Sequence, residues 1–129
     1  MIVLDASAAV ELVFATLPGA AVAQRLRGEA VHSPAHFDVE VIGAIRRAVV
    51  RRLITDHEGL VAVADFQSLP VRRWPTKPFV ERAYRLRSTH TVADGVYVAL
   101  AEGLAAPLIT CDGRLFQSHG HGAEIELIA

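Results

Sequence analysis

Short apolar runs recur along the chain, each bounded by turn residues or polar positions. Runs of this kind, rich in Val, Ile and Leu, are typical of buried strands. The sequence predicts five of them: Ile2–Leu4, Ala30–Ser33, Leu69–Arg73, Pro107–Thr110 and Glu124–Ile128. Because Pro70 cannot donate a hydrogen bond to a neighbouring strand, the third strand is expected at an edge of the sheet.

Longer segments between these runs have the period of amphipathic helices. They are Ser7–Phe14, a helix after Pro18 that ends near Arg27, a long helix from Ala35 to about Arg52, a helix from Thr55 to about Gln67, Phe79–Arg87, Val92–Leu104, and a single turn at Gly113–Ser118. Ser7, Thr55 and Thr91 stand where N-caps belong. The helix from Ala35 is apolar nearly all round until its arginine-rich end, and we expect it to be substantially buried. Alternating strands and helices predict a parallel α/β sandwich around one sheet.

Composition narrows the class of protein. The 129 residues fit one domain, 1–129, and 52% of them are hydrophobic, enough for a sizeable core. No apolar run approaches the roughly 20 residues that span a bilayer, and Asp5 interrupts the first apolar stretch, so no secretory signal is expected. The lone cysteine, Cys111, suits a reducing cytoplasm. With a net charge of −1, only local arginine clusters such as Arg46 and Arg47 could contact a polyanion.

Four acidic residues each stand beside an apolar segment: Asp5, Glu40, Asp94 and Asp112. Taken singly, each has a structural explanation. Asp5 could cap the helix that follows it, and Asp94 occupies the acid position of a capping box opened by Thr91. Asp112 is followed by glycine, an ordinary turn pair. Glu40 could be a solvated helix residue, although apolar side chains surround it.

The placement of the four acids relative to the strands favours a shared site. Asp5 and Asp112 follow strands, and ligands of open parallel sheets gather beyond the carboxyl ends of the strands. Glu40 and Asp94 lie in the first turns of helices that start from the same edge. Buried carboxylates are costly unless they are paired or hold a cation, and their oxygens suit Mg²⁺ or Mn²⁺. Such an ion can activate water for attack on a phosphodiester, so the acids indicate phosphate chemistry.

The motifs built on these acids resemble those of the PIN-domain ribonucleases, most closely the VapC-type toxins of bacterial toxin–antitoxin pairs. They are Val3–Ala8, Glu40–Arg47, Asp94–Glu102 and Thr110–Leu115. Each motif is weak alone, but the four occur in the family's order across almost the whole chain. The resemblance implies a PIN-like three-layer α/β/α sandwich with a central parallel sheet of about five short strands.

The resemblance also implies a metal-dependent endoribonuclease that hydrolyses RNA with a metal-activated water. The four acids would be its catalytic residues and its ligands for Mg²⁺, with Mn²⁺ an alternative. Two hydroxyls would steady the carboxylates or the water: Ser7 and Thr110. Asp38, two residues before Glu40, could supply a different acid, although Glu40 fits the motif better. Some relatives place a further polar residue soon after the fourth acid, whereas Leu115 and Phe116 stand here and no acid appears until Glu124, so a second metal would bind weakly or only with substrate.

The partners implied by the resemblance are RNA, a small VapB-like antitoxin and a second copy of the chain. An arginine from the antitoxin's C-terminal segment would satisfy the carboxylates and displace the metal, because guanidinium groups match paired carboxylates. The expected homodimer surface lies around Phe79, Ala83 and Tyr84.

Several other residues are interpreted as structural. Cys111 alternates to the opposite side of its strand and is expected to be a small buried filler. His119 and His121 have no third ligand at matching spacing, so a solvated loop is favoured over a zinc site. Tyr97 is predicted to be core rather than a base-stacking residue, and Trp74 either an interface anchor or a loop-packing residue.

Four other functions share parts of this pattern. A haloacid-type phosphatase needs Asp-x-Asp, whereas Ala6 and Ser7 follow Asp5. A receiver domain needs a late lysine, and the only lysine is Lys77 in a mid-chain loop. A non-catalytic PIN module that only binds a partner is disfavoured by the presence of all four acids, and a PIN nuclease of RNA processing stays open as an alternative.

Overall fold

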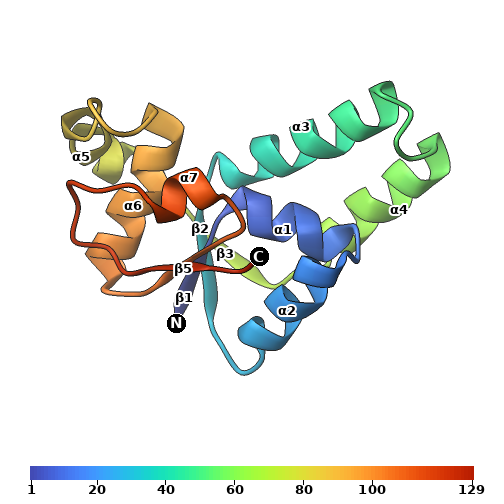
Figure 1. Ribbon diagram of the computed structural model, residues 1–129, viewed down its shortest axis with the longest axis horizontal. Helices are drawn as coiled ribbons and strands as arrows, with labels where there is room; N and C mark the ends of the chain where they lie inside the picture. The colour runs from blue at the N-terminus through green and yellow to red at the C-terminus, as the bar shows by residue number, and fades with distance from the viewer.

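A five-stranded parallel sheet forms the centre of the computed structural model, which describes residues 1–129 (Figure 1). Its strands are β1 (Ile2–Leu4), β2 (Val31–Pro34), β3 (Val71–Trp74), β4 (Leu108–Thr110) and β5 (Ile125–Leu127). The strand order is β3-β2-β1-β4-β5, and every neighbouring pair is parallel. All five predicted strands are present, and β3 lies at an edge, as Pro70 indicated.

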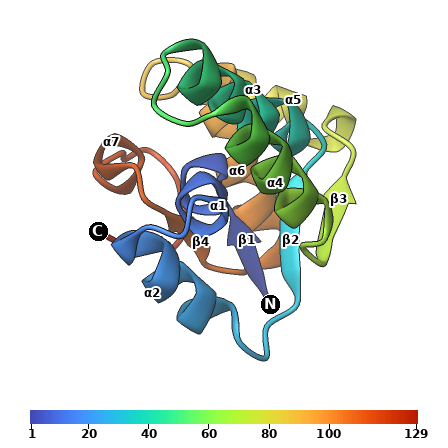
Figure 2. The same cartoon turned by 90° about the vertical axis from the view of Figure 1, so that its right-hand side faces the viewer.

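Helices cover both faces of this sheet. They are α1 (Ala6–Val13), α2 (Leu17–Leu26), α3 (Phe37–Val50), α4 (Asp56–Gln67), α5 (Val80–Arg85), α6 (Val92–Leu104) and α7 (Gly113–Phe116), with a 3-10 turn, η1, at Lys77–Phe79. Figure 2 shows α1 to α4 in front of the sheet and α5 and α6 behind it, so the molecule has the three predicted layers. No single helix is long and apolar enough to cross a membrane; only α1 and α2 together reach such a length, across a bend of 111°.

The N-terminus of α1 differs from the prediction. The helix begins at Ala6, so Asp5 holds the N-cap position, and Ser7 lies inside the first turn. Asp5 has the extended backbone of a cap, but its side chain makes no capping hydrogen bond. Neither the Asp5 carboxylate nor the Ser7 hydroxyl is therefore used to cap α1. The other two predicted caps, Thr55 and Thr91, are confirmed.

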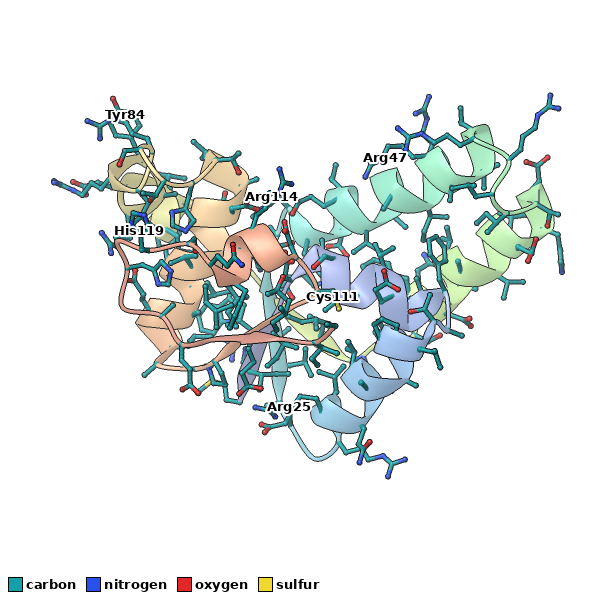
Figure 3. All side chains as sticks on the ribbon, in the orientation of Figure 1. Arg25, Arg47, Tyr84, Cys111, Arg114 and His119 are labelled. Carbon is teal, nitrogen blue, oxygen red and sulfur yellow. The ribbon has the colours of Figure 1, made fainter.

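Helix α6 is the most deeply buried helix, with seven consecutive buried residues, Gly95–Ala101. A Cβ at Gly95 would lie only 3.0 Å from the Cα of Ala83, so glycine allows α5 to pack closely on α6. Ala83 is therefore fully buried, and its assignment to a dimer surface was wrong. Its neighbour Tyr84 is exposed and points outward from α5 (Figure 3).

Helix α3 is less buried than its composition indicated. One face, Phe37, Val41, Ile45 and Ala48, enters the core. The opposite face carries three exposed apolar residues: Val39, Ile42 and Val50. With α4 it forms a hairpin that projects from the body of the molecule (Figure 1). Among the helices, α3 packs mainly against α1 and α4, and its opposite face is left exposed.

Candidate active site

Asp5 is the most deeply buried of the four acids, with 6% of its surface exposed. One carboxylate oxygen, Oδ2, accepts hydrogen bonds from Ser7 Oγ at 2.5 Å and from Thr110 Oγ1 at 2.7 Å. The backbone N–H of Asp5 donates to the carbonyl of Ile109 at 2.9 Å, which holds the residue beside the end of β4. Asp5, Ser7 and Thr110 form one cluster where the two central strands end.

Burial raises the pKa of Asp5 above its ordinary value, and the bonds from Ser7 and Thr110 only partly offset this effect. The negative charges of Asp94 and Glu40 raise the pKa further. No lysine, arginine or histidine forms an ion pair with Asp5; every ion pair of the chain involves another acid. Three of the four predicted acids therefore act on one another electrostatically, and none of the three forms an ion pair with a lysine or arginine.

Glu40 lies in the first turn of α3 with its side chain half-buried. Its Oε1 is buried and has no hydrogen-bond partner, and the nearest basic atom is His36 Nε2 at 3.4 Å. Asp38, the alternative acid, is instead bonded to Arg73 on β3, with Nη2 to Oδ1 at 2.8 Å. Of the two acids, Glu40 is the one that acts on Asp5.

Asp94 lies in the first turn of α6, where its backbone N–H donates to Thr91 Oγ1 at 3.2 Å. This is only half of a capping box, because no bond returns from the Asp94 carboxylate to the Thr91 N–H, as it does between Glu58 and Thr55 in α4. The structural explanation for this acid thus accounts for its N–H and leaves its carboxylate free for another role.

Asp112 differs from the other three acids. Its carboxylate caps α7 by accepting the N–H of Arg114 at 2.9 Å, and Arg114 Nε lies 3.7 Å away. Its own N–H donates to Thr110 Oγ1 at 3.0 Å, which joins it to the Asp5 cluster. It is not among the charges that shift the pKa of Asp5. The fold therefore brings Asp112 to the same edge but gives it a structural task as well.

The donor set fits a hard divalent cation held mainly through water. No three His, Cys, Asp or Glu side chains converge closely enough to form a protein cage. Mg²⁺ normally needs no such cage, because it keeps several waters and is held by one or two carboxylates together with substrate phosphates. The buried, unpartnered Oε1 of Glu40 and the mutually repelling carboxylates of Asp5 and Asp94 are suitable oxygen donors.

Two further residues lie beside these acids, and the sequence did not indicate these contacts. Tyr97 is fully buried, as predicted for a core residue, but its hydroxyl has no hydrogen-bond partner and lies in the field of Asp5 and Glu40. His36 packs edge-on against the Tyr97 ring, with centroids 4.9 Å apart. The available signal was spacing. His36 stands four residues before Glu40 at the start of α3, and Tyr97 stands three residues after Asp94 in α6, so each pair lies on one side of its helix.

The residues set aside in the sequence have structural surroundings. Cys111 is half-buried, and burial raises the pKa of its thiol to about 11, so the thiol stays protonated at neutral pH. Trp74 packs within the chain: its Nε1 donates to His32 Nδ1 at 2.9 Å, and Arg72 lies over its ring. His121 lies beside His90 without forming a metal-binding group.

Comparison with known proteins adds to this geometry. A model of the PIN domain matches residues 2–120. The chain is 81% identical to ribonuclease VapC12 of Mycobacterium tuberculosis over 129 residues, all of both chains. It is 35% identical over 128 residues to ribonuclease VapC1 of the same organism, covering 98% of this chain and 96% of that one. The crystal structure of M. tuberculosis VapC20, described as a sarcin-ricin loop cleaving toxin, has the same fold. Its TM-score is 0.66 at 19% identity, over 89% of this chain and 92% of that one.

Proposed function

Because the chain belongs to the PIN-domain family and, within it, to the VapC-type ribonucleases, we propose that it is a toxin endoribonuclease that hydrolyses RNA phosphodiester bonds. The observation that carries the proposal is Asp5, a buried carboxylate held by two hydroxyls, without a basic partner and beside two further acids. We place the activity in the cytoplasm and assign it to residues 1–129 as one PIN domain.

In this proposal Asp5, Glu40 and Asp94 bind Mg²⁺ or Mn²⁺, and Asp112 completes the site from the end of β4. The ion, when bound, lowers the pKa of a water and neutralises charge on the phosphodiester. Ser7 and Thr110 orient Asp5 by occupying its Oδ2 and leaving Oδ1 for the ligand. The hydroxyl of Thr110 also accepts the N–H of Asp112, so one side chain sets the positions of two acids.

The proposal is tested with purified protein and a structured RNA labelled at one end. Internal cuts should appear with Mn²⁺ or Mg²⁺ and should stop on addition of EDTA. Cleavage that persists in EDTA would contradict the metal-dependent mechanism. A protein whose melting temperature responds to Mn²⁺ but which cuts no RNA offered to it would indicate the non-catalytic module instead.

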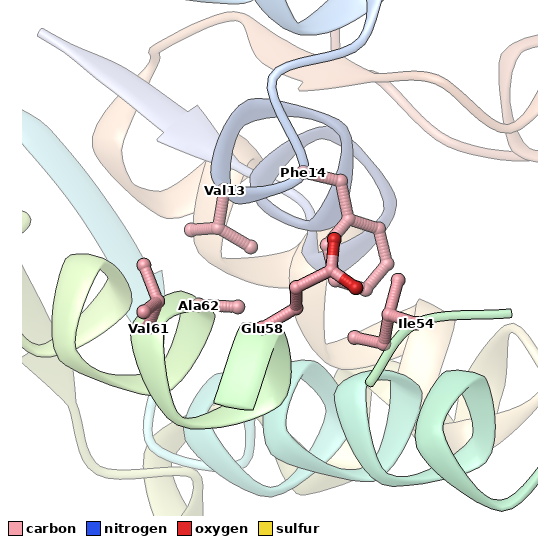
Figure 4. A pocket seen from close by; sticks show the side chains of 6 residues that line it. All are labelled: Val13, Phe14, Ile54, Glu58, Val61 and Ala62. Carbon is pink, nitrogen blue, oxygen red and sulfur yellow. The ribbon is translucent and has the colours of Figure 1, made fainter. Parts of the chain in front are cut away.

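We further propose that a VapB-like antitoxin inhibits the protein by spanning α1. A pocket of about 240 Å³ at the C-terminal end of α1 is lined by Val13, Phe14, Ile54, Val61 and Ala62, with Glu58 at its side (Figure 4). It can receive an apolar side chain from the antitoxin. The acids lie at the other end of α1, about 12 Å away for eight helical residues, a distance that about four extended residues cover.

An antitoxin segment should therefore carry an apolar anchor and an arginine roughly four residues apart. Expression of this chain alone should slow growth, and co-expression of the partner should restore it. Val13→Asp should abolish the rescue while leaving the toxicity, because the pocket is remote from the acids. Rescue of the Val13→Asp variant at the normal level would remove this pocket from the interface.

We also propose a homodimer, with the surface corrected by the structure. Ala83 is buried, whereas Val80 and Tyr84 on α5 are 47% and 60% exposed and form the outer face of that short helix. Light scattering at micromolar concentration should report about twice 13.9 kDa. Tyr84→Glu should reduce this mass to that of one chain; a monomeric parent protein over the same range would refute the dimer.

A further inference from the structure

Three of the four buried side-chain atoms without a hydrogen-bond partner gather at one place in the molecule. They are His36 Nδ1, Glu40 Oε1 and Tyr97 Oη; the fourth, His90 Nε2, lies elsewhere. A polar atom that is buried without a hydrogen-bond partner destabilises the folded chain. Such a concentration is unusual for a folded core and needs a cause other than stability, such as a catalytic role or a bound ion and its water.

His36 connects the two helices that carry Glu40 and Asp94. It stands at the N-cap position of α3 but makes no capping bond. Its Nε2 lies 3.1 Å from the carbonyl oxygen of Ala93, the residue directly before Asp94. Because a carbonyl can only accept, Nε2 carries the proton in this contact and donates it. The same atom is 3.4 Å from Glu40 Oε1, so a single N–H faces both helices.

Tyr97 approaches the same carboxylate from α6. It lies one turn after Asp94 on the same helix face, and its ring meets the His36 ring edge-on at 60°. Burial, followed by the charges of Asp5 and Glu40, raises the pKa of its hydroxyl. A phenolic hydroxyl can donate as well as accept, so Oη can donate to a carboxylate. Its unused O–H and the unused acceptor Oε1 of Glu40 complement each other.

We propose that Tyr97 and His36 are positioning residues of the nuclease site, Tyr97 by donating its O–H to Glu40 when that carboxylate binds a divalent cation, and His36 by holding α3 and α6 at the separation that this bond requires. The inference rests on the proposed metal-dependent function. Groups that hydrogen-bond to metal ligands typically change metal affinity by about 10–100-fold when they are removed. A residue of the hydrophobic core alone would have no such effect.

The test is Mn²⁺ binding measured by calorimetry on the full chain without RNA. Tyr97→Phe removes one oxygen and keeps the ring, so its melting temperature without metal should equal or exceed that of the parent protein. Its Mn²⁺ affinity should fall by about 10-fold or more. Tyr84→Phe, the same change at the only other tyrosine, keeps an exposed ring that points outward from α5, and it should bind Mn²⁺ normally.

His36 is tested by a pair of substitutions. His36→Leu removes the donor and should weaken Mn²⁺ binding, whereas His36→Gln keeps an N–H that can reach Ala93 and should restore much of it. His57→Gln on the exposed part of α4 is the matched control. In a Glu40→Gln background, Tyr97→Phe should have no further effect on the affinity, because it acts through Glu40.

The outcomes separate the two proposals. A parent protein that binds neither Mn²⁺ nor Mg²⁺ overturns the metal-dependent function and this inference together. Binding by the parent protein with unchanged affinity in Tyr97→Phe overturns the inference alone. A loss of affinity in Tyr97→Phe that persists undiminished in the Glu40→Gln background also overturns it, since the hydroxyl would then act by another route.

Discussion

Acids at the carboxyl end of the sheet and acids on the outer surfaces are held in opposite ways. On the surface, Glu126 accepts two hydrogen bonds from Arg25, at 2.8 and 3.0 Å, and Glu102 accepts two from Arg82, at 2.9 and 3.0 Å. These arginines lower the pKa of both acids. Asp5 has only hydroxyl donors, and burial raises its pKa.

The difference separates two uses of one side chain. A carboxylate bonded by a guanidinium fork has both oxygens occupied and contributes to stability. A carboxylate held on one oxygen by neutral donors keeps the other oxygen for a ligand, at a cost to the free energy of folding. Asp38 shows how finely the chain makes this distinction, since it lies two residues from Glu40 and has an arginine partner that Glu40 lacks.

The largest effect is expected from removing the charge of Asp5. Asp5→Asn should reduce RNA cleavage by at least about 100-fold, the scale of a single electrostatic group in a catalytic site. It should also raise the melting temperature without metal, because a buried charge that repels Asp94 and Glu40 is lost. Asp38→Asn is the matched control and should cleave normally but melt slightly lower. An Asp5→Asn protein that cleaves at the parent rate would place Asp5 among the structural acids.

Metal should stabilise the site and leave the surface pairs unaffected. Mn²⁺ at 100 times its dissociation constant adds about 2.7 kcal/mol to the free energy of unfolding, which scanning calorimetry detects as a rise in melting temperature. EDTA should reverse the rise, and Asp5→Asn should not show it. Glu102→Gln should show the full rise. An equal rise in Asp5→Asn and in the parent protein would mean that the ion binds elsewhere.

A smaller loss of stability is expected when Glu102 is replaced. Besides pairing with Arg82 of α5, this residue of α6 accepts the N–H of Gly122 at 2.8 Å and so connects a loop to both helices. Glu102→Gln should lower the free energy of unfolding by about 1 kcal/mol, discounted because Arg82 is 40% exposed. Glu81→Gln breaks the exposed pair with Arg85 and should change nothing measurable. Urea unfolding compares the two variants, and equal losses would remove the distinction between them.

The smallest expected effect is on how the free energy of unfolding depends on pH. Because the pKa of Glu126 is lower in the folded chain than in the unfolded chain, its stabilisation is complete above the ordinary value of 4.5 and is lost as the pH falls through the folded-state pKa. In Glu126→Gln, the loss of unfolding free energy between pH 6 and pH 3 should be smaller by a few tenths of a kcal/mol, because the pair with Arg25 is partly exposed. Urea midpoints between pH 3 and 6 measure it, and an unchanged loss would assign the pH dependence to other acids.

Much of the fold could be predicted because strand and helix periods are local properties. The five strands, the caps at Thr55 and Thr91 and the edge position of β3 all follow from neighbouring residues. The exposure of Val39 and the burial of Ala83 do not, since each depends on which element packs against the residue. Ser7 was misplaced as a cap because the N-cap of α1 lies two residues earlier, at Asp5, and helix ends are the least certain part of a sequence-based assignment.

The sequence predicted which acids form the candidate site but not how their side chains contact one another. Motif order indicated Asp5, Glu40, Asp94 and Asp112, but only the fold shows that Asp112 also caps α7. The bond between Asp5 and Thr110 joins residues 105 positions apart, and no periodic pattern reports a contact of that range. The roles proposed for the acids stay predictions that the experiments above decide.

Strand β4 has a consequence for how the protein is made. It pairs with β1 in the middle of the sheet, although it is one of the last strands of the chain. On the ribosome, Asp5 lacks the Thr110 hydroxyl and the neighbouring Asp112 until the segment that carries β4 has been made. The proposed nuclease site is therefore incomplete until that segment has been synthesised.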